Sequence, residues 1–304
     1  MITIATRQSP LALKQTDIVI DALRTHYPEL SINIQPMTTQ GDRQLDQSLA
    51  KIGGKGLFIK ELEKALLDGS AELAVHSMKD MPMELHPELE MMSVLPRAEV
   101  RDALVCNQYS SLSELPANAV VGTSSLRRAA QLKAWRPDLN VKPLRGNVNT
   151  RLNKLDNNEF DAIILAAAGL QRLSLQNRIG ELLPTEKMLP AAAQGVLCVE
   201  FRKNNTALKN QLASIHHPDV ECCVLAERAI VNALQASCHT PVGTLATHLP
   251  DDSLMLQSMV GMPDGSHIIT ASATGQINQA EQLAQIVSQQ LNEQGAQRIL
   301  HLGK

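Results

Sequence analysis

The first two-thirds of this 304-residue chain alternates short β-branched runs with amphipathic stretches of helical period. We expect strands at residues 2–5, 32–37 and 73–76. A helix should begin at Ser9-Pro10, because serine caps helix N-termini and proline fits the first helical turn. This alternation is typical of α/β proteins whose sheets are largely parallel.

Two short segments resemble each other. Ala5-Thr6-Arg7-Gln8-Ser9 and Val121-Gly122-Thr123-Ser124-Ser125 each combine a strand end, hydroxyl side chains and the start of a helix. Free backbone N–H groups and the positive end of a helix dipole make such a junction a site for anions. Two junctions of this kind predict two similar lobes that bind an anionic ligand.

Beyond His216-His217-Pro218 the pattern changes to that of a small α+β domain. The expected elements are a helix at 219–234, a loop at 237–241, strands at 254–260 and 267–272, and a final helix at 280–291. A chain of this length is expected to form two or three domains.

Positive charge is concentrated between Gly122 and Lys154. That segment holds eight Lys and Arg residues and one acid, Asp138, whereas the rest of the chain has 20 basic and 30 acidic residues. Arginine predominates, which suits two-pronged recognition of carboxylate or phosphate. The charge distribution predicts a partner that carries several negative charges.

Arg127 and Arg128 lie in the first turn of the helix expected after Ser125, where cations oppose the helix dipole. Another group must compensate this cost, and a bound anion would do so. Lys133 and Arg136, further along the same helix, fit a solvated helix face instead.

Asp80 lies in His76-Ser77-Met78-Lys79-Asp80-Met81-Pro82, directly after an expected buried strand. Ligands of open α/β sheets bind beyond the carboxyl ends of strands, which favours a catalytic role. The alternative is a surface turn with a local ion pair worth under about 1 kcal/mol. His76 is expected to be a packed strand-end residue rather than a ligand.

Motifs and composition argue against several common functions. Gly53-Gly54-Lys55-Gly56 lacks both the phosphate-loop spacing and the dinucleotide fingerprint, so we expect a flexible loop. From such a loop Lys51 and Lys55 can reach an anionic ligand. Aromatic residues make up 2% of the chain, which argues against the base stacking used by single-stranded nucleic-acid binders.

No apolar run approaches the roughly 20 residues of a membrane span, and the first residues lack the features of a signal peptide. A cytoplasmic location is therefore expected.

Five cysteines without a Cys-x-x-Cys pattern argue against a disulfide framework and against a zinc site, so no metal is expected. Four of them are expected to be small buried hydrophobes: Cys106, Cys198, Cys222 and Cys223. Cys238 lies in a polar loop, where a free thiol is a liability unless it is used.

Seven segments in succession form a further pattern. They are Ala5-Thr6-Arg7-Gln8-Ser9-Pro10-Leu11-Ala12-Leu13, Gly53-Gly54-Lys55-Gly56-Leu57-Phe58, His76-Ser77-Met78-Lys79-Asp80-Met81-Pro82, Gly122-Thr123-Ser124-Ser125-Leu126-Arg127-Arg128, Leu144-Arg145-Gly146-Asn147-Val148-Asn149-Thr150-Arg151-Leu152, Ala226-Glu227-Arg228-Ala229, and Cys238 with Pro241. With these segments the chain resembles the porphobilinogen deaminase (hydroxymethylbilane synthase) family over essentially its full length.

The resemblance implies two similar α/β domains of the solute-binding-protein type and a small C-terminal α+β domain. The implied division is 1–97 with 196–215, then 98–195, then 216–304. It also implies a transferase of tetrapyrrole (haem and porphyrin) biosynthesis that works as a monomer. Four porphobilinogen molecules would be condensed into the linear tetrapyrrole hydroxymethylbilane, with release of four ammonia. The implied cofactor is dipyrromethane, bound as a thioether to Cys238.

The resemblance also assigns roles to individual residues. Asp80 would be the catalytic carboxylate, which stabilises the cation left when ammonia departs. The implied cofactor-binding residues are Ser9, Lys79, Thr123, Ser125, Arg127 and Arg128. The implied substrate-binding residues are Arg7, Arg145, Arg151 and Arg172, and a mobile loop would carry Lys51, Lys55 and Phe58. Each pyrrole carries an acetate and a propionate, so a polycarboxylate partner accounts for the arginines. The expected partners are porphobilinogen and the growing polypyrrole, with neither nucleic acid nor membrane.

The chain departs from the family pattern around Cys238. Ala236, Ser237 and His239 stand where the family usually has two glycines and a glutamine, which restricts the loop backbone. We expect cofactor attachment to survive because the thiol is kept.

Two other classes of function stay open. A non-catalytic, two-lobed anion-binding protein would explain the paired junctions but not the loop thiol. A nucleic-acid-binding protein would explain the basic segment only. Release of ammonia from porphobilinogen distinguishes the deaminase from both.

Overall fold

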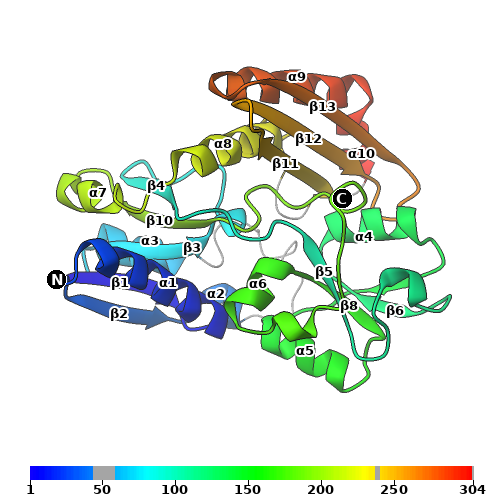
Figure 1. Cartoon of the computed structure of the whole chain (residues 1–304), viewed down its shortest axis with the longest axis horizontal. Coiled ribbons are helices and arrows are strands. Elements are labelled where there is room, and N and C mark those ends of the chain that lie inside the picture. Colours follow the sequence, from blue (N-terminus) through cyan, green and yellow to red (C-terminus); the bar gives the residue numbers. More distant parts are fainter. Residues whose placement is uncertain (44–58, 237–239, 303–304) are drawn as a thin grey trace. The chain divides into compact units, whose positions relative to one another are not determined.

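The structure is a computed structural model that describes residues 1–43, 59–236 and 240–302 (Figure 1). Contacts between residues group the chain into two compact units. The first comprises Met1–Ala98 and Gly195–Glu221, and the second comprises Glu99–Gln194 and Cys222–Lys304.

A mixed five-stranded sheet forms the centre of the first unit, with strand order β2-β1-β3-β10-β4. β1 is parallel to β2 and β3, whereas β10 is antiparallel to β3 and β4. The strands are β1 (Ile2–Arg7), β2 (Ile32–Met37), β3 (Leu73–Ser77), β4 (Leu89–Val94) and β10 (Leu197–Arg202). The helices are α1 (Pro10–His26), α2 (Gln40–Arg43), α3 (Lys60–Leu67), the 3₁₀ helix η1 (Met78–Asp80) and α7 (Thr206–Leu212).

Helices cover both faces of this sheet because its strands are apolar on both sides. Val19 and Leu23 of α1 pack with Ile4 of β1 in one buried cluster, which also includes Leu208 of α7. On the opposite face, Leu62 of α3 packs in a second cluster with small strand residues such as Ala5 and Ala74. Burial on both faces is typical of sheets with parallel strands.

The second unit contains a sheet of the same design, with strand order β7-β6-β8-β5-β9. β6 is parallel to β7 and β8, and β5 is antiparallel to β8 and β9. Strand for strand, this repeats the arrangement of the first sheet, which confirms the expectation of two similar α/β lobes. The strands are β5 (Asp102–Cys106), β6 (Val120–Gly122), β7 (Asn140–Lys142), β8 (Ala162–Ala166) and β9 (Glu181–Leu182). The helices are η2 (Leu112–Glu114), α4 (Leu126–Trp135), α5 (Val148–Asp156), α6 (Ala167–Arg172) and η3 (Gln176–Arg178).

The second unit also holds an antiparallel three-stranded sheet, β11-β12-β13, which confirms the predicted C-terminal α+β region. Figure 1 shows α9 lying along this sheet, and Leu283, Val287 and Leu291 of α9 are buried. The elements are α8 (Pro218–Ala233), which enters this unit at Cys222, then β11 (Val242–His248), β12 (Ser253–Gly261), β13 (Ile268–Gln276), η4 (Ile277–Gln279), α9 (Ala280–Glu293) and α10 (Ala296–Leu302). Within the ranges described, no helix is both long and apolar enough to cross a membrane.

Two of the four cysteine predictions were wrong. Cys198 and Cys223 are buried, but Cys106 and Cys222 are only partly buried. The Cys106 thiol lies 3.0 Å from the Asp161 carbonyl oxygen, and that of Cys222 lies 3.3 Å from the Ile277 carbonyl oxygen. Cys106 ends β5, where an apolar pattern in the sequence does not guarantee burial, whereas Cys222 lies inside α8 on a partly exposed face.

Glu227, from the segment Ala226-Glu227-Arg228-Ala229, joins three parts of the second unit. Its side chain is fully buried in α8 and accepts hydrogen bonds from the N–H groups of Ala193 (2.6 Å) and Ala246 (2.8 Å). Ala193 has a φ of 60°, in the left-handed region that favours glycine. The carboxylate therefore holds a strained backbone position and the first strand of the C-terminal sheet against one helix.

Replacing Glu227 with Gln should lower the free energy of unfolding by about 1–3 kcal/mol, because the amide turns an N–H group toward a buried backbone donor. Urea unfolding of Glu227→Gln measures this change. The control is Glu281→Gln, at an exposed position in the first turn of α9. Equal unfolding midpoints for the two variants would contradict the role assigned to Glu227.

Candidate functional site

In the first unit the predicted site residues lie at one edge of the sheet. Arg7 ends β1, Ser9 follows it, and Lys79 and Asp80 lie in η1 directly after β3. β1 and β3 are parallel and paired from Ile4 with Leu73 onward, so their carboxyl ends meet at the same edge. This is the edge at which open α/β sheets bind ligands.

Ser9 is the N-cap of α1, as predicted. Its hydroxyl accepts a hydrogen bond from the Ala12 N–H at 3.3 Å, and Pro10 occupies the first turn. The Thr6 and Thr16 hydroxyls are joined at 2.8 Å beneath this junction. These contacts fix the start of α1 beside the end of β1, as an anion site at a helix N-terminus requires.

The segment after β3 is held by a hydrogen bond from α1 and by a buried contact between two side chains of the sheet. Gln15 of α1 donates to the Ser77 hydroxyl at 2.7 Å. His76 is buried, as expected for a packed residue, and its Nε2 lies 3.1 Å from Glu200 Oε2 in β10. Asp80 is exposed at the end of η1. The fixed strand end therefore presents a solvent-accessible carboxylate.

The second unit repeats this junction after β6. Ser125 caps α4 by accepting from the Arg128 N–H at 3.4 Å, and Thr123 Oγ1 accepts from the Ser125 N–H at 3.2 Å. Because β6, β7 and β8 run parallel, the segments that follow them meet at one edge. The predicted residues Thr123, Arg145 and Arg172 follow these three strands in that order.

Gly146 shapes the turn that carries Arg145. Its φ is 113°, and a Cβ at this position would lie 2.6 Å from the Thr150 side chain. Asn147 then caps α5 by accepting from the Thr150 N–H at 2.9 Å. Arg151 donates from Nε to the Gly146 carbonyl at 2.8 Å. The turn thus brings Arg145 and Arg151 to the same short segment.

Arg172 ends α6, the short helix after β8. Burial lowers the pKa of its guanidinium from 12.5 to about 10. A positive charge held in partly dehydrated surroundings is costly in the free protein and is offset when a carboxylate binds. Arg172 therefore has the electrostatic character of a ligand-binding arginine.

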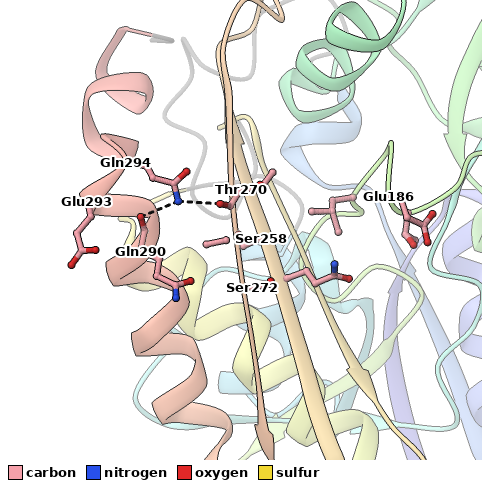
Figure 2. A pocket seen from close by; sticks show the side chains of 11 residues that line it. Glu186, Ser258, Thr270, Ser272, Gln290, Glu293 and Gln294 are labelled. Atoms are coloured by element: carbon pink, nitrogen blue, oxygen red, sulfur yellow. Dashed lines mark hydrogen bonds between the residues drawn. The ribbon is translucent and has the colours of Figure 1, made fainter.

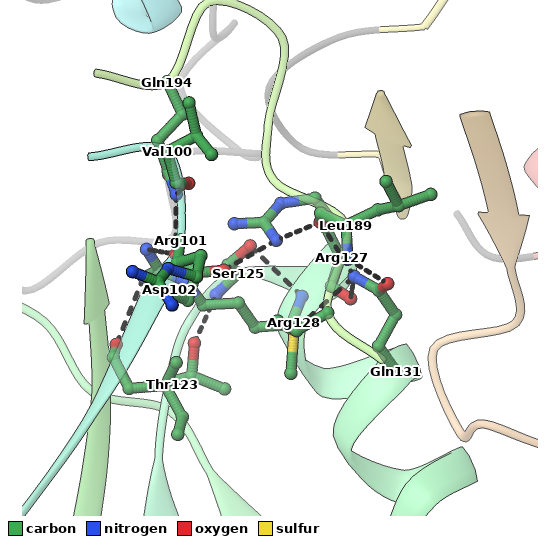
Figure 3. Close-up of polar contacts among 12 residues, drawn as sticks. Val100, Arg101, Asp102, Thr123, Ser125, Arg127, Arg128, Gln131, Leu189 and Gln194 are labelled. Carbon is green, nitrogen blue, oxygen red and sulfur yellow. Dashed lines mark hydrogen bonds and ion pairs between the residues drawn. The ribbon is translucent and has the colours of Figure 1, made fainter. Parts of the chain in front are cut away.

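Figure 3 shows the contacts of Arg127 and Arg128, which lie in the first turn of α4 and share the buried carboxylate of Asp102. Arg127 Nη1 lies 2.8 Å from Asp102 Oδ2 and 2.6 Å from the Leu189 carbonyl. Arg128 Nη2 lies 2.7 Å from Asp102 Oδ1, and its Nη1 lies 3.1 Å from the Ile164 carbonyl. Both guanidinium groups are therefore fixed by protein acceptors.

The group that compensates the two cations against the helix dipole is Asp102, so a bound anion is not required for that purpose. Asp102 begins the otherwise apolar strand Asp-Ala-Leu-Val-Cys and was not among the predicted site residues. An acid at the start of an apolar strand could have indicated this role, because a buried carboxylate needs cationic or hydrogen-bonding partners.

Arg136 also differs from its predicted role as part of a solvated helix face. Its guanidinium donates to the Leu112 carbonyl (2.6 Å), to the Leu115 carbonyl (2.9 Å) and to both oxygens of Asp138. Arg136 therefore anchors the loop around η2 and contributes to the fold.

A cavity of about 650 Å³ lies in the same unit, between the C-terminal sheet and the segment around Thr185 (Figure 2). Amides and hydroxyls from β12, β13 and α9 line it together with Glu186 and Glu293. Two carboxylates and no lysine or arginine make this lining unsuitable for a polycarboxylate. The arginine-bearing sheet edge is the better candidate site.

Four predicted residues lie outside the described part of the chain: Lys51, Lys55, Phe58 and Cys238. Among the described residues, no group of three or more His, Cys, Asp or Glu side chains is arranged to hold a metal ion.

Two α/β sheets of one design, each with hydroxyl and cationic groups beyond the carboxyl ends of its parallel strands, are the arrangement expected of a two-lobed, anion-binding α/β protein. Comparison with known proteins narrows the class. Residues 2–210 match the family model "Porphobilinogen deaminase, dipyromethane cofactor binding domain", and residues 221–293 match "Porphobilinogen deaminase, C-terminal domain". The chain belongs to the porphobilinogen deaminase family.

Curated relatives support the same assignment. The chain is 54% identical to a porphobilinogen deaminase of Chromobacterium violaceum, over 98% of this chain and 96% of that protein. It is 51% identical to one from Thiobacillus denitrificans, over 98% of this chain and 97% of that protein. Among solved structures, a periplasmic substrate-binding protein of a Coxiella burnetii ABC transporter matches with 14% identity and a TM-score of 0.46, over 73% of this chain and 94% of that one.

The chain therefore has porphobilinogen deaminase activity, with a dipyrromethane cofactor domain, in tetrapyrrole biosynthesis. The described residues fit that cofactor. Dipyrromethane carries several carboxylates, and the sheet edge that follows β6, β7 and β8 supplies arginines. Arg128 also retains a buried Nε–H that has no hydrogen-bond partner within the described ranges.

Replacing Arg172 with Met should stabilise the cofactor-free protein by about 1–3 kcal/mol, because each unit of pKa shift corresponds to about 1.4 kcal/mol. The folded pKa of Arg172 is lowered, so the cost of its charge is present at neutral pH and fades as the pH rises through about 10. Urea unfolding of protein shown by intact mass to lack cofactor measures the change. Arg178→Met, which removes an arginine paired with Asp156 at the surface, is the control and should give no gain. A lower midpoint for Arg172→Met than for the parent would contradict the assignment.

Proposed function

We propose that Asp80 is the catalytic carboxylate of this deaminase and that Cys238 carries dipyrromethane as a thioether. The reaction is the condensation of four porphobilinogen molecules into hydroxymethylbilane, with uptake of one water and release of four ammonia. The exposed position of Asp80 beyond the carboxyl end of β3 supports the first assignment. A thiol in a polar loop of the sequence, in the family's motif with Pro241, supports the second.

The proposed work of Asp80 follows from the charge of the reacting molecule. Porphobilinogen becomes a cation when the amino group of its aminomethyl substituent leaves as ammonia and the methylene carbon stays on the ring, and a nearby carboxylate stabilises that cation. The same group can receive the proton that the attacking pyrrole loses from its α-carbon once the new C–C bond has formed. When bound, dipyrromethane supplies the free pyrrole α-carbon that attacks the first cation.

The remaining residues bind and orient carboxylates. We assign Ser9, Lys79, Thr123, Ser125, Arg127 and Arg128 to the cofactor, and Arg7, Arg145, Arg151 and Arg172 to the substrate and the growing polypyrrole. Lys51, Lys55 and Phe58 are proposed to lie on a loop that covers the ligand. Arginine suits this task because its planar fork matches both oxygens of a carboxylate.

We further propose three domains: residues 1–97 with 196–215, residues 98–195, and residues 216–304. The three separate sheets and the break between the two family matches support this division. We also infer, from the family alone, a monomer that works in the cytoplasm. Light scattering of the purified protein tests the monomer: a mass near 33.1 kDa is expected, and twice that value would overturn it.

Asp80→Asn should lower kcat by about 10²–10⁴-fold while the protein stays folded, because the amide can neither balance a cation nor accept a proton. Ammonia release from porphobilinogen is the measurement. Glu84→Gln, four residues on at an exposed position, is the matched control and should retain parental turnover. Near-parental turnover by Asp80→Asn would remove Asp80 from the catalytic role.

Cys238→Ser should carry no covalent dipyrrole and should lose turnover, because the hydroxyl is a far weaker nucleophile than a thiolate. Intact mass of the denatured protein gives the answer directly. The control is Cys222→Ser, whose thiol is partly exposed in α8 and should be dispensable for loading. A dipyrrole retained by Cys238→Ser would place the attachment at another residue.

A further inference from the structure

The buried triad of Asp102, Arg127 and Arg128 is more than the fold requires. Their exposed fractions are 0%, 4% and 6%. Replacing a buried ion triad with apolar side chains of similar volume is often neutral or stabilising, because charges lose their hydration when buried. The cost of this triad therefore calls for a role beyond packing.

Asp102 is built to hold two guanidinium groups at once. Its Oδ1 accepts from Arg128 Nη2 at 2.7 Å and from Gln194 Nε2 at 2.9 Å, while its Oδ2 accepts from Arg127 Nη1 at 2.8 Å. Burial would raise the pKa of Asp102, but the charges and hydrogen bonds of the two arginines outweigh it and hold that pKa far below its usual range. Asp102 is therefore a permanent anion.

A second contact, to a backbone carbonyl, fixes each arginine in addition to Asp102. Arg127 is held by the Leu189 carbonyl, which Gln131 also contacts through a hydrogen bond of 3.1 Å. Gln131 in turn accepts from the Leu189 N–H at 2.7 Å. Arg128 is held by the Ile164 carbonyl of β8. Each guanidinium plane is thus defined by at least two acceptors.

The triad has a definite charge. Two guanidinium groups and one carboxylate leave a net charge of +1, and neighbouring Arg101 is already neutralised by Glu99 at 2.6 Å. One positive charge attracts one ligand carboxylate. Without Asp102 the pair would carry two adjacent, buried positive charges that repel each other and the helix dipole.

We propose that Asp102 is a positioning residue. Oriented by Gln194, Asp102 fixes the geometry and the charge of the Arg127–Arg128 pair, so that the pair binds a single cofactor carboxylate. Asp102 does not touch the ligand in this proposal. It acts through the two arginines, and Gln194 restrains it by bridging to the Val100 carbonyl at 2.7 Å.

This inference rests on the proposed function, in which Arg127 and Arg128 bind the cofactor. The first experiment therefore separates the two. Arg127→Leu and Arg128→Leu should each lower the fraction of protein that carries covalent dipyrromethane, measured by intact mass. Parental loading in both would defeat the proposed role of the pair itself, and the present inference with it.

The decisive variant is Asp102→Asn, which keeps the size of the side chain and removes its charge. Displacing a binding group commonly weakens binding or slows the reaction about tenfold or more. In the folded fraction we therefore expect about a tenfold lower ratio of loaded to unloaded protein, or a similar rise in KM for porphobilinogen. Asp102→Glu, which keeps the charge, should recover part of either loss. Asp138→Asn is the matched control, because Asp138 also binds an arginine with both oxygens but lies at the surface.

A purely structural role predicts a different result. Asp102→Asn would then lower the urea midpoint while its folded fraction kept parental loading and KM, and that outcome overturns the proposal. The double variant Asp102→Asn/Arg128→Gln restores the net charge of +1 without the geometry. It should recover stability but not loading, and recovery of loading by charge alone would overturn the positioning role of Asp102.

A second variant decides the question if Asp102→Asn does not fold. Gln194→Met preserves volume and charge but removes one of the hydrogen bonds to Asp102. Like Asp102→Asn, it should lower loading or raise KM, but by a smaller factor. Parental values of both in Gln194→Met would overturn the proposal in that case.

Discussion

The parallel pairing of β1 with β3, and of β6 with β7 and β8, is the constraint on which the candidate site depends. Parallel strands end at a common edge, so the segments that follow them meet there although they are far apart in sequence. In the first sheet this brings the start of α1 close to Asp80. In the second it gathers hydroxyls and arginines from three separate segments. These edges suit the proposed carboxylate-binding site because backbone N–H groups and cations are available there.

Electrostatic cost accompanies this arrangement. Arg172 is held in surroundings that lower the pKa of its guanidinium, and the Asp102 triad is buried although apolar side chains could replace it at similar stability. Sites that must bind a charged ligand commonly give up stability in this way. The fold tolerates the cost because large apolar clusters lie on both faces of each sheet, and because Glu227 of α8 joins β11 to the segment at Ala193.

Sequence patterns anticipated most elements of the fold. The expected strands and helices agree with the structure to within two residues at most ends, since β-branched runs and capped helices are local signals. β13 is the exception: it continues to Gln276, because pairing with β12 extends it through Thr274 and Gly275, residues with no strand pattern of their own. The caps at Ser9 and Ser125 were predictable for the same local reason. Arg136 was misjudged because its carbonyl partners at Leu112 and Leu115 lie outside its own helix.

The sequence by itself determined the α/β alternation, the two similar junctions and the family, because each is written in short runs of neighbouring residues. Only the tertiary structure decided which group balances Arg127 and Arg128. Asp102 lies 25 residues away from Arg127 along the chain and becomes its partner through the antiparallel pairing of β5 with β8, together with the placement of α4 against the same sheet. A charge in sequence shows what must be compensated, whereas the packing of distant segments decides what compensates it.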